Sequence, residues 1–153
     1  MSMKITNRKS LGCLTVVLLL TLLLTGCGAI SSGALDARVR QMLDLDVKGD
    51  CDASYALLYP GVTDEETYRE TFTQILEYFP VTEGYTMILE HYGRTKRIGT
   101  DAGTFEDGQY KVEFDGQVFH AFVEYRSDKQ GSGFTMFRIV SQQDLAGAAD
   151  NHV

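Results

Sequence analysis

Cysteine and histidine, the residues best suited to nucleophilic and metal chemistry, are few and scattered in this chain. Its 153 residues include three cysteines, Cys13, Cys27 and Cys51, and three histidines. None are grouped at the short spacing of a structural zinc site, so we predict no metal ligands. Cys51 has two interpretations, a reactive thiol or a half-buried bystander. The lack of an activating partner beside it favours the bystander.

Cys27 ends an apolar segment that follows a basic one. Residues 1–10 hold three bases and no acid, and residues 11–24 are uncharged and rich in leucine. This apolar stretch of 14 residues is too short to span a bilayer as a helix, which takes about 20 residues. The two segments are therefore typical of a signal peptide.

The four residues Leu24-Thr25-Gly26-Cys27 resemble the bacterial lipobox. In that family a diacylglyceryl group is attached to the cysteine thiol, and a peptidase cuts just before the cysteine. The resemblance implies a lipoprotein signal peptide at 1–26, lipid attachment at Cys27, and a flexible tether at 27–33. The protein would then be anchored on the extracytoplasmic face of a bacterial cell membrane, since several acyl chains anchor far more firmly than one. The alternatives are an ordinary signal peptide with an incidental cysteine, and an uncleaved anchor.

Cleavage before Cys27 would change the charge of the chain. The full sequence has 14 Lys and Arg against 21 Asp and Glu, and residues 1–26 contain three of the bases and no acid, so the net charge falls from −7 to −10. An acidic domain is a poor match for nucleic acid or for an anionic membrane surface. We therefore predict no nucleic-acid partner, and membrane attachment through the lipid rather than through a basic patch. With Cys13 removed and Cys27 lipidated, no intramolecular disulfide can form.

Apolar residues recur at helical spacing in the first part of the mature chain. We predict helices over 34–48 and 52–59, the second ending before a Pro-Gly pair. A third begins at a capping box, with Thr63 as N-cap and Glu66 three residues later. The apolar faces of the first and third helices are Leu35, Val39, Met42 and Leu43, and Tyr68, Phe72, Ile75 and Phe79.

From residue 85 the apolar pattern has a period of two, which predicts strands. The Asp115-Gly116 pair suits a two-residue hairpin turn and fixes the register, so that Phe114 faces Gln117. Residues 94–108 are left open between strand, bulge and loop. The candidate strands are 85–98, 109–114, 117–126 and 134–141. The expected core face of the hairpin is Tyr110, Val112, Phe114, Phe119, Ala121, Val123 and Tyr125.

Helices followed by an antiparallel sheet predict an α+β domain over residues 34–141, with 142–153 as a polar tail. The Lys48-Gly49-Asp50 break and the following Ala53-Ser54-Tyr55-Ala56-Leu57-Leu58-Tyr59-Pro60 are similar to the same segment of small bacterial lipoproteins with the nuclear-transport-factor-two-like (cystatin-like) fold. Most of those proteins are of unknown function. The resemblance implies three N-terminal helices packed on a curved antiparallel sheet of about four strands, forming a cone with a pocket between helices and sheet.

Four residues are candidates for lining the implied pocket: Tyr55, His91, Tyr110 and Tyr125. His91 is the leading candidate for an acid or base, which catalysis in such a pocket requires. The three tyrosines are either polar-tipped lining residues or core residues with their hydroxyls at the rim. His120 is expected to be a surface histidine pointing away from the pocket. We assign no catalytic residue.

Val118 and Phe122 are apolar residues on the expected wet face of the sheet, which indicates a possible interface with a second copy or an envelope protein. Taken together, the sequence favours a non-catalytic, lipid-anchored module that binds a small ligand or a protein. The alternative is a small isomerase-like or hydratase-like enzyme, and a third option is an obligate dimer with a structural envelope role. The sequence indicates no cofactor and does not identify the ligand.

Overall fold

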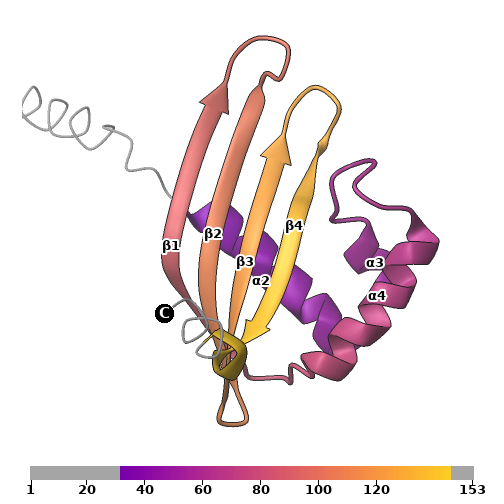
Figure 1. The fold of residues 1–153 in the computed structure, drawn as a ribbon, viewed down its shortest axis with the longest axis vertical. Helices are drawn as coiled ribbons and strands as arrows, with labels where there is room; N and C mark the ends of the chain where they lie inside the picture. Colours follow the sequence, from indigo (N-terminus) through magenta and orange to yellow (C-terminus); the bar gives the residue numbers. More distant parts are fainter. Residues whose placement is uncertain (1–31, 146–153) are drawn as a thin grey trace, which may run out of the picture. The chain divides into compact units, whose positions relative to one another are not determined.

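The computed structural model describes residues 32–145 as an α+β domain (Figure 1). In this part of the chain, three helices precede a single antiparallel sheet of four strands in the order β1-β2-β3-β4. The helices are α2 (Gly33–Lys48), α3 (Cys51–Tyr55) and α4 (Glu65–Tyr78), and the strands are β1 (Thr86–Arg97), β2 (Gly103–Phe114), β3 (Gln117–Ser127) and β4 (Ser132–Ser141). The α+β prediction is confirmed. The predicted signal peptide, Cys27 and the end of the polar tail lie outside the described residues. Within residues 32–145, no helix is long and apolar enough to span a membrane.

The β2–β3 hairpin has the predicted turn and register. Asp115 and Gly116 have φ angles of 48° and 74°, as a type I′ turn requires. Phe114 pairs with Gln117, and the pairing continues without a shift to the far end of both strands. The expected core residues of this hairpin therefore face the helices, and most of them are buried.

The β1–β2 hairpin is longer than its apolar pattern indicates. β2 begins at Gly103 rather than at residue 109, so residues 94–108 form the ends of two strands and the short connection between them. The β1 register shifts at a bulge, because Leu89 pairs with Tyr110 whereas His91 pairs with Gln109. This bulge interrupts the alternation of polar and apolar residues on which sequence prediction relies.

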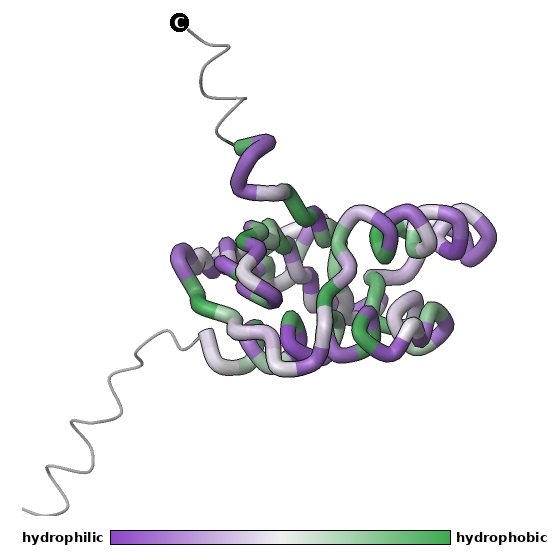
Figure 2. Tube along the Cα trace, turned by 90° about the horizontal axis from the view of Figure 1, so that it is seen from below, coloured by the Kyte–Doolittle hydropathy of each residue, from purple (hydrophilic) through white to green (hydrophobic). Residues whose placement is uncertain are grey.

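The hydrophobic core lies between α2 and one face of the sheet (Figure 1). The alternation of hydrophobic and hydrophilic residues along the chain can be followed in Figure 2. The predicted apolar face of α2 is wholly buried, and it meets the core face of the β2–β3 hairpin. Gly108 allows this close approach, because a Cβ there would lie 2.7 Å from the Tyr110 ring and 3.1 Å from Leu35.

The N-cap of α4 is Asp64, so the prediction of Thr63 is wrong by one residue. The Asp64 carboxylate accepts hydrogen bonds from the Thr67 backbone N–H and hydroxyl, both at 2.9 Å, and these bonds lower its pKa. A carboxylate is favoured here because it also interacts with the positive end of the helix dipole. The apolar face of α4 is as predicted, with Tyr68 and Phe72 buried.

The second helix is shorter than predicted, because α3 ends at Tyr55 and not at residue 59. The chain beyond α3 pairs instead with the edge of β4. The Tyr59 backbone N–H donates to the Phe134 carbonyl and the Phe134 N–H donates to the Leu57 carbonyl, each at 2.9 Å. A tertiary pairing thus replaces the last helical turn and ties the α3–α4 region to the sheet.

Candidate functional site

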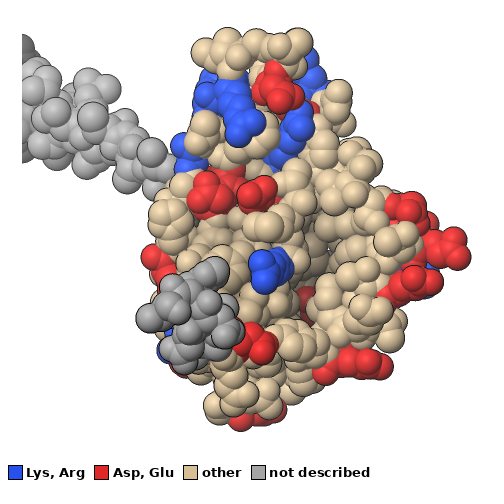
Figure 3. Space-filling model, viewed as in Figure 1, with Lys and Arg blue, Asp and Glu red and all other residues tan. Residues whose placement is uncertain are grey.

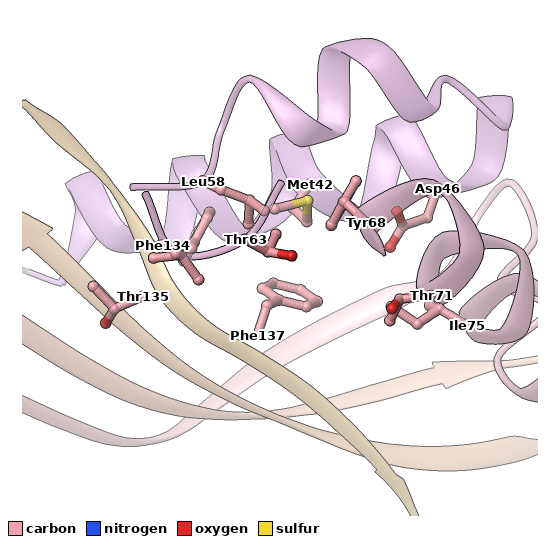
Figure 4. Close-up of a pocket in the computed structure, with 11 residues that line it drawn as sticks. Met42, Asp46, Leu58, Thr63, Tyr68, Thr71, Ile75, Phe134, Thr135 and Phe137 are labelled. Carbon is pink, nitrogen blue, oxygen red and sulfur yellow. The ribbon is translucent and has the colours of Figure 1, made fainter. Parts of the chain in front are cut away.

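A cavity of about 200 Å³ lies between the helices and the β4 edge of the sheet. Figure 3 shows this face of the molecule hollowed between the sheet and α4, and Figure 4 shows the cavity wall. The wall is mostly apolar, with a few hydroxyls and a single carboxylate. Its principal residues are Met42 and Asp46 from α2, Tyr68 and Ile75 from α4, and Phe134 and Phe137 from β4.

Among the described residues that line the cavity, Asp46 supplies the only charged group. It lies three to four residues beyond Met42 and Leu43, so the helical period directs it to the buried face of α2. Asp46 is only 6% exposed, and Figure 4 shows its carboxylate directed toward the cavity. Within residues 32–145, no hydrogen bond or ion pair reaches that carboxylate. No fully buried polar side-chain atom in this part of the chain lacks a partner, so the Asp46 oxygens are open to the cavity.

Burial raises the pKa of Asp46 from 3.8 to about 7. An ionised carboxylate loses its hydration in this apolar wall, and no cation of the described chain replaces it. The position of Asp46 in the last turn of α2, at the negative end of the helix dipole, disfavours the charge further. A cation or a hydrogen-bond donor that entered the cavity would therefore stabilise the ionised Asp46 carboxylate.

Tyr68 lines the cavity, but its hydroxyl already donates a hydrogen bond within the protein. The Tyr68 and Ser54 hydroxyl oxygens are 2.5 Å apart, and the Ser54 hydroxyl lies 3.0 Å from the Met42 sulfur. A thioether has no proton to give, so Ser54 donates to Met42 and Tyr68 donates to Ser54. Burial raises the pKa of Tyr68 to about 12, so this tyrosine stays neutral at physiological pH.

The threonine hydroxyls of the wall also donate to acceptors of the protein. Thr71 donates to the Thr67 carbonyl at 2.9 Å. Thr63 and Thr135 make longer contacts, each of 3.4 Å, with backbone carbonyls. The polar groups of the wall therefore offer acceptors to a ligand, through the Asp46 carboxylate and the remaining hydroxyl lone pairs.

The four residues predicted to line a pocket lie outside this wall. Tyr110 is fully buried, and its hydroxyl donates to Asp36 at 2.8 Å. The Tyr125 ring lies 4.1 Å below the guanidinium of Arg38. Tyr55 and Tyr125 each pack behind a wall residue, with ring centroids 5.5 Å from Tyr68 and 5.3 Å from Phe134.

His91 lies on the sheet face opposite to α2. Its side chain is 70% exposed, and its Nε2 is 3.6 Å from the Asp107 carboxylate. Strict alternation from Leu89 would place His91 on the face toward α2. The β1 bulge after Leu89 places it on the opposite face instead.

His120 points away from the helices, as expected, but it is 8% exposed and not a surface residue. Its Nδ1 lies 3.0 Å from Glu90 Oε2, and its Nε2 lies 2.7 Å from the Gln142 side-chain oxygen. These contacts from β1 and from the segment after β4 bury the imidazole.

The proposed interface residues Val118 and Phe122 are half-buried on the same outer face. The Cys51 thiol is free and half-buried, and desolvation raises its pKa. Within residues 32–145, no group of histidine, cysteine and acidic side chains is placed to hold a metal ion.

Asp46 is the functional candidate that sequence analysis missed. The signal was present, because an acid occupies the next position of the α2 apolar stripe after Leu35, Val39, Met42 and Leu43. What the sequence could not reveal is that α4 and β4 close over this position.

Comparison of the chain with protein-family models, with curated proteins and with solved structures gave no match.

Proposed function

We propose that this protein is a lipid-anchored, extracytoplasmic binding module, held in a bacterial membrane through Cys27, that takes a small amine in the cavity between its helices and β4. The lipobox and the short tether support the anchoring. One observation carries the ligand chemistry: the buried carboxylate of Asp46, without a partner in the described chain, faces a mostly apolar cavity.

The polar groups of the cavity wall favour a ligand that donates hydrogen bonds or carries a positive charge. An ammonium group would give Asp46 the counter-ion that it lacks, and the apolar part of the ligand would pack against Ile75 and Phe137. A ligand carboxylate would meet the like charge of Asp46, and the Tyr68 and Thr71 hydroxyls already donate to acceptors of the protein, so its binding would be disfavoured. Binding of a cation would also return the pKa of Asp46 toward its ordinary range.

For the domain itself we propose the nuclear-transport-factor-two-like cone. The order of three helices before a four-stranded meander supports this assignment, as does a cavity between helices and sheet. The assignment implies that the cavity is the principal binding site of the domain.

The alternative function is an isomerase-like or hydratase-like enzyme, with Asp46 rather than His91 as its base. The pKa of about 7 favours it, because a base that titrates near neutrality is suited to proton transfer. Against it, stabilising an enolate needs a donor, and the Tyr68 hydroxyl is already committed to Ser54. We therefore prefer binding.

Calorimetry with three matched probes tests the binding proposal. At pH 8, benzylamine should bind the wild-type protein, benzyl alcohol should bind more weakly, and benzoate should not bind. Asp46→Asn should weaken benzylamine binding by about 10-fold or more, since hydrogen bonds to charged groups contribute about 1.5–3 kcal/mol. Glu77→Gln, which removes an exposed acid of α4, is the control and should change nothing.

Two results would replace the proposal. Benzoate binding as tightly as benzylamine would remove the amine assignment. Accelerated exchange of the α-protons of cyclohexanone in D₂O, abolished by Asp46→Asn, would establish the enzyme instead.

A further inference from the structure

The bases of this acidic domain gather at one end of the sheet. Figure 3 shows Lys and Arg at the end where β1 turns into β2 and acids over α4. We define the basic tip as Arg94, Lys96 and Arg97 at the end of β1, the neighbouring Lys129 of the β3–β4 connection, and Ile98. Lys129 shares a shallow depression with Gly99 and Thr100, which places the two connections together.

The charges of the basic tip are not neutralised by the described part of the chain. Within residues 32–145, Arg94, Lys96 and Lys129 make no ion pair, and Arg97 stacks 4.3 Å over the Phe105 ring. Asp101 and Asp128 at this end both pair with Arg126, and Glu106, which lies opposite Arg94 in the strand register, pairs with Arg38. Bases elsewhere are paired more often, as in Arg38–Glu106 and in Arg69 with Asp52 and Glu65.

Ile98 is the most exposed large hydrophobic residue of the described chain, at 92%. It directly follows Lys96 and Arg97 as the first residue of the connection between β1 and β2. An isoleucine raised into water between bases has no packing role in the fold. Basic residues around an exposed apolar side chain are the combination that binds the interface of an anionic bilayer.

The chain enters the domain within reach of such a surface. Four residues lie between Cys27 and Ser32, so the Cα atoms of these two residues are at most about 17 Å apart when the segment is extended. α2 begins beside the middle of β2, since Asp36 accepts from Tyr110 and Arg38 pairs with Glu106. From Tyr92, which donates to Glu106, six strand residues lead to Ile98, a further rise of about 20 Å. Because these two lengths are similar, a domain held on this tether can bring its basic tip to the bilayer by tilting toward the membrane surface.

We propose that the basic tip contacts the anionic phospholipid headgroups of the membrane in which the protein is anchored, with Ile98 inserted at the interface. This inference rests on the lipid anchoring proposed above. The acidic remainder of the domain is repelled by the same surface, so the contact favours one orientation of the domain on the membrane.

The chain contains no tryptophan, so a single introduced tryptophan reports on its own surroundings. Ile98→Trp is the probe. Ile88→Trp is the matched control, because Ile88 is a 53% exposed isoleucine near the other end of β1. The full-length protein is incorporated into phosphatidylglycerol and into phosphatidylcholine vesicles that contain brominated lipid, and flotation measures the anchored fraction.

In phosphatidylglycerol vesicles we expect the fluorescence emission of the tryptophan at 98 to shift to the blue and to lose at least half of its intensity through quenching by the brominated lipid. In phosphatidylcholine vesicles we expect neither change. The tryptophan at 88 should not respond. Adding R94Q, K96Q and R97Q to the Ile98→Trp protein should abolish the response while the protein still floats.

A protein that floats while the tryptophan at 98 stays unquenched in phosphatidylglycerol would overturn the tip contact and leave the anchor intact. Equal quenching in both lipids, or equal quenching at 88, would overturn it as well. Loss of flotation would remove the anchor and the tip contact together, and it would leave the amine site to its own calorimetric test.

Discussion

The cavity and the basic tip both contain charges without partners in the described chain, but in opposite surroundings. Asp46 is buried in an apolar wall, and this burial raises its pKa, whereas the side chains of Arg94 and Lys96 are exposed to water. A buried unpaired charge destabilises the free protein and favours a specific counter-ion. An exposed cluster costs little and favours an extended surface of opposite charge. The difference in burial therefore separates a site for a small ligand from a site for a membrane.

The largest difference in unfolding free energy is expected between two glycine-to-alanine substitutions, one beside the cavity and one beside the basic tip. In Gly133→Ala the new Cβ would lie 2.4 Å from the backbone of Leu58 and Tyr59. The pairing that holds the α3–α4 region to β4 would break, at a cost of about 4 kcal/mol or more. In Gly99→Ala, next to Ile98 of the basic tip, the new Cβ meets no atom within 4 Å and strains only a φ of +110°, so about 1 kcal/mol is expected. Urea denaturation measures both, and equal losses would contradict the tight β4 junction.

Removing the buried charge should stabilise the protein. The pKa of Asp46 is higher in the folded state, at about 7, than its ordinary value of 3.8. The folded protein therefore binds the proton more tightly, and its stability decreases as the pH rises from about 4 to about 7. At pH 8 Asp46→Asn should raise the free energy of unfolding by about 2–4 kcal/mol.

The same substitution should have little effect at pH 4, where the carboxyl is protonated in the fold. Thermal denaturation between pH 4 and pH 8 measures this difference. Parallel curves for wild type and Asp46→Asn would show that the carboxylate is solvated or paired. Glu77→Gln is again the control for the loss of one acid.

Tyr68→Phe removes the hydroxyl that donates to Ser54. Ser54 keeps its contact with Met42, so the loss should be about 1–1.5 kcal/mol, the contribution of one hydrogen bond. Benzylamine binding should be nearly unchanged, because Tyr68 has no free proton to offer. A binding loss comparable to that of Asp46→Asn would mean that Tyr68 contacts the ligand directly.

Neutralising the basic tip should have the smallest effect on stability. Arg94→Gln with Lys96→Gln removes exposed charges that make no ion pair in the described chain, so the free energy of unfolding should change by less than about 0.5 kcal/mol. Chemical denaturation checks this directly. A larger loss would assign these residues a structural role and weaken the membrane interpretation.

Much of the fold followed from local rules. The Asp115-Gly116 turn and the alternation around it predicted the β2–β3 register over residues 109–114, because turn geometry and burial pattern agree there, and the structure continues that register to Thr104. The apolar faces of α2 and α4 followed from helical spacing. Prediction failed where tertiary contacts override local preference, as at Leu58, where β4 pairing ends the second helix early.

The candidate site was harder to predict than the fold. Asp46 belongs to a helix whose apolar stripe was recognised, but its burial in a cavity depends on α4 and β4, which are distant in sequence. His91 was favoured because its residue type suits catalysis, and the β1 bulge turns it to the opposite face. The net charge of −10 argued against a basic surface, yet Arg94, Lys96 and Arg97 lie together at the end of β1, and Lys129 of the β3–β4 connection joins them. Average composition cannot reveal such segregation.

The most direct test of the central claim is the pKa of Asp46, measured by carboxyl ¹³C NMR with and without benzylamine. The free protein should titrate at about 7 at this residue, and saturating benzylamine should move the pKa down toward its ordinary range. A pKa near 4 in the free protein, unchanged by benzylamine, would mean that Asp46 is neither an unpaired buried charge nor the group that binds an amine.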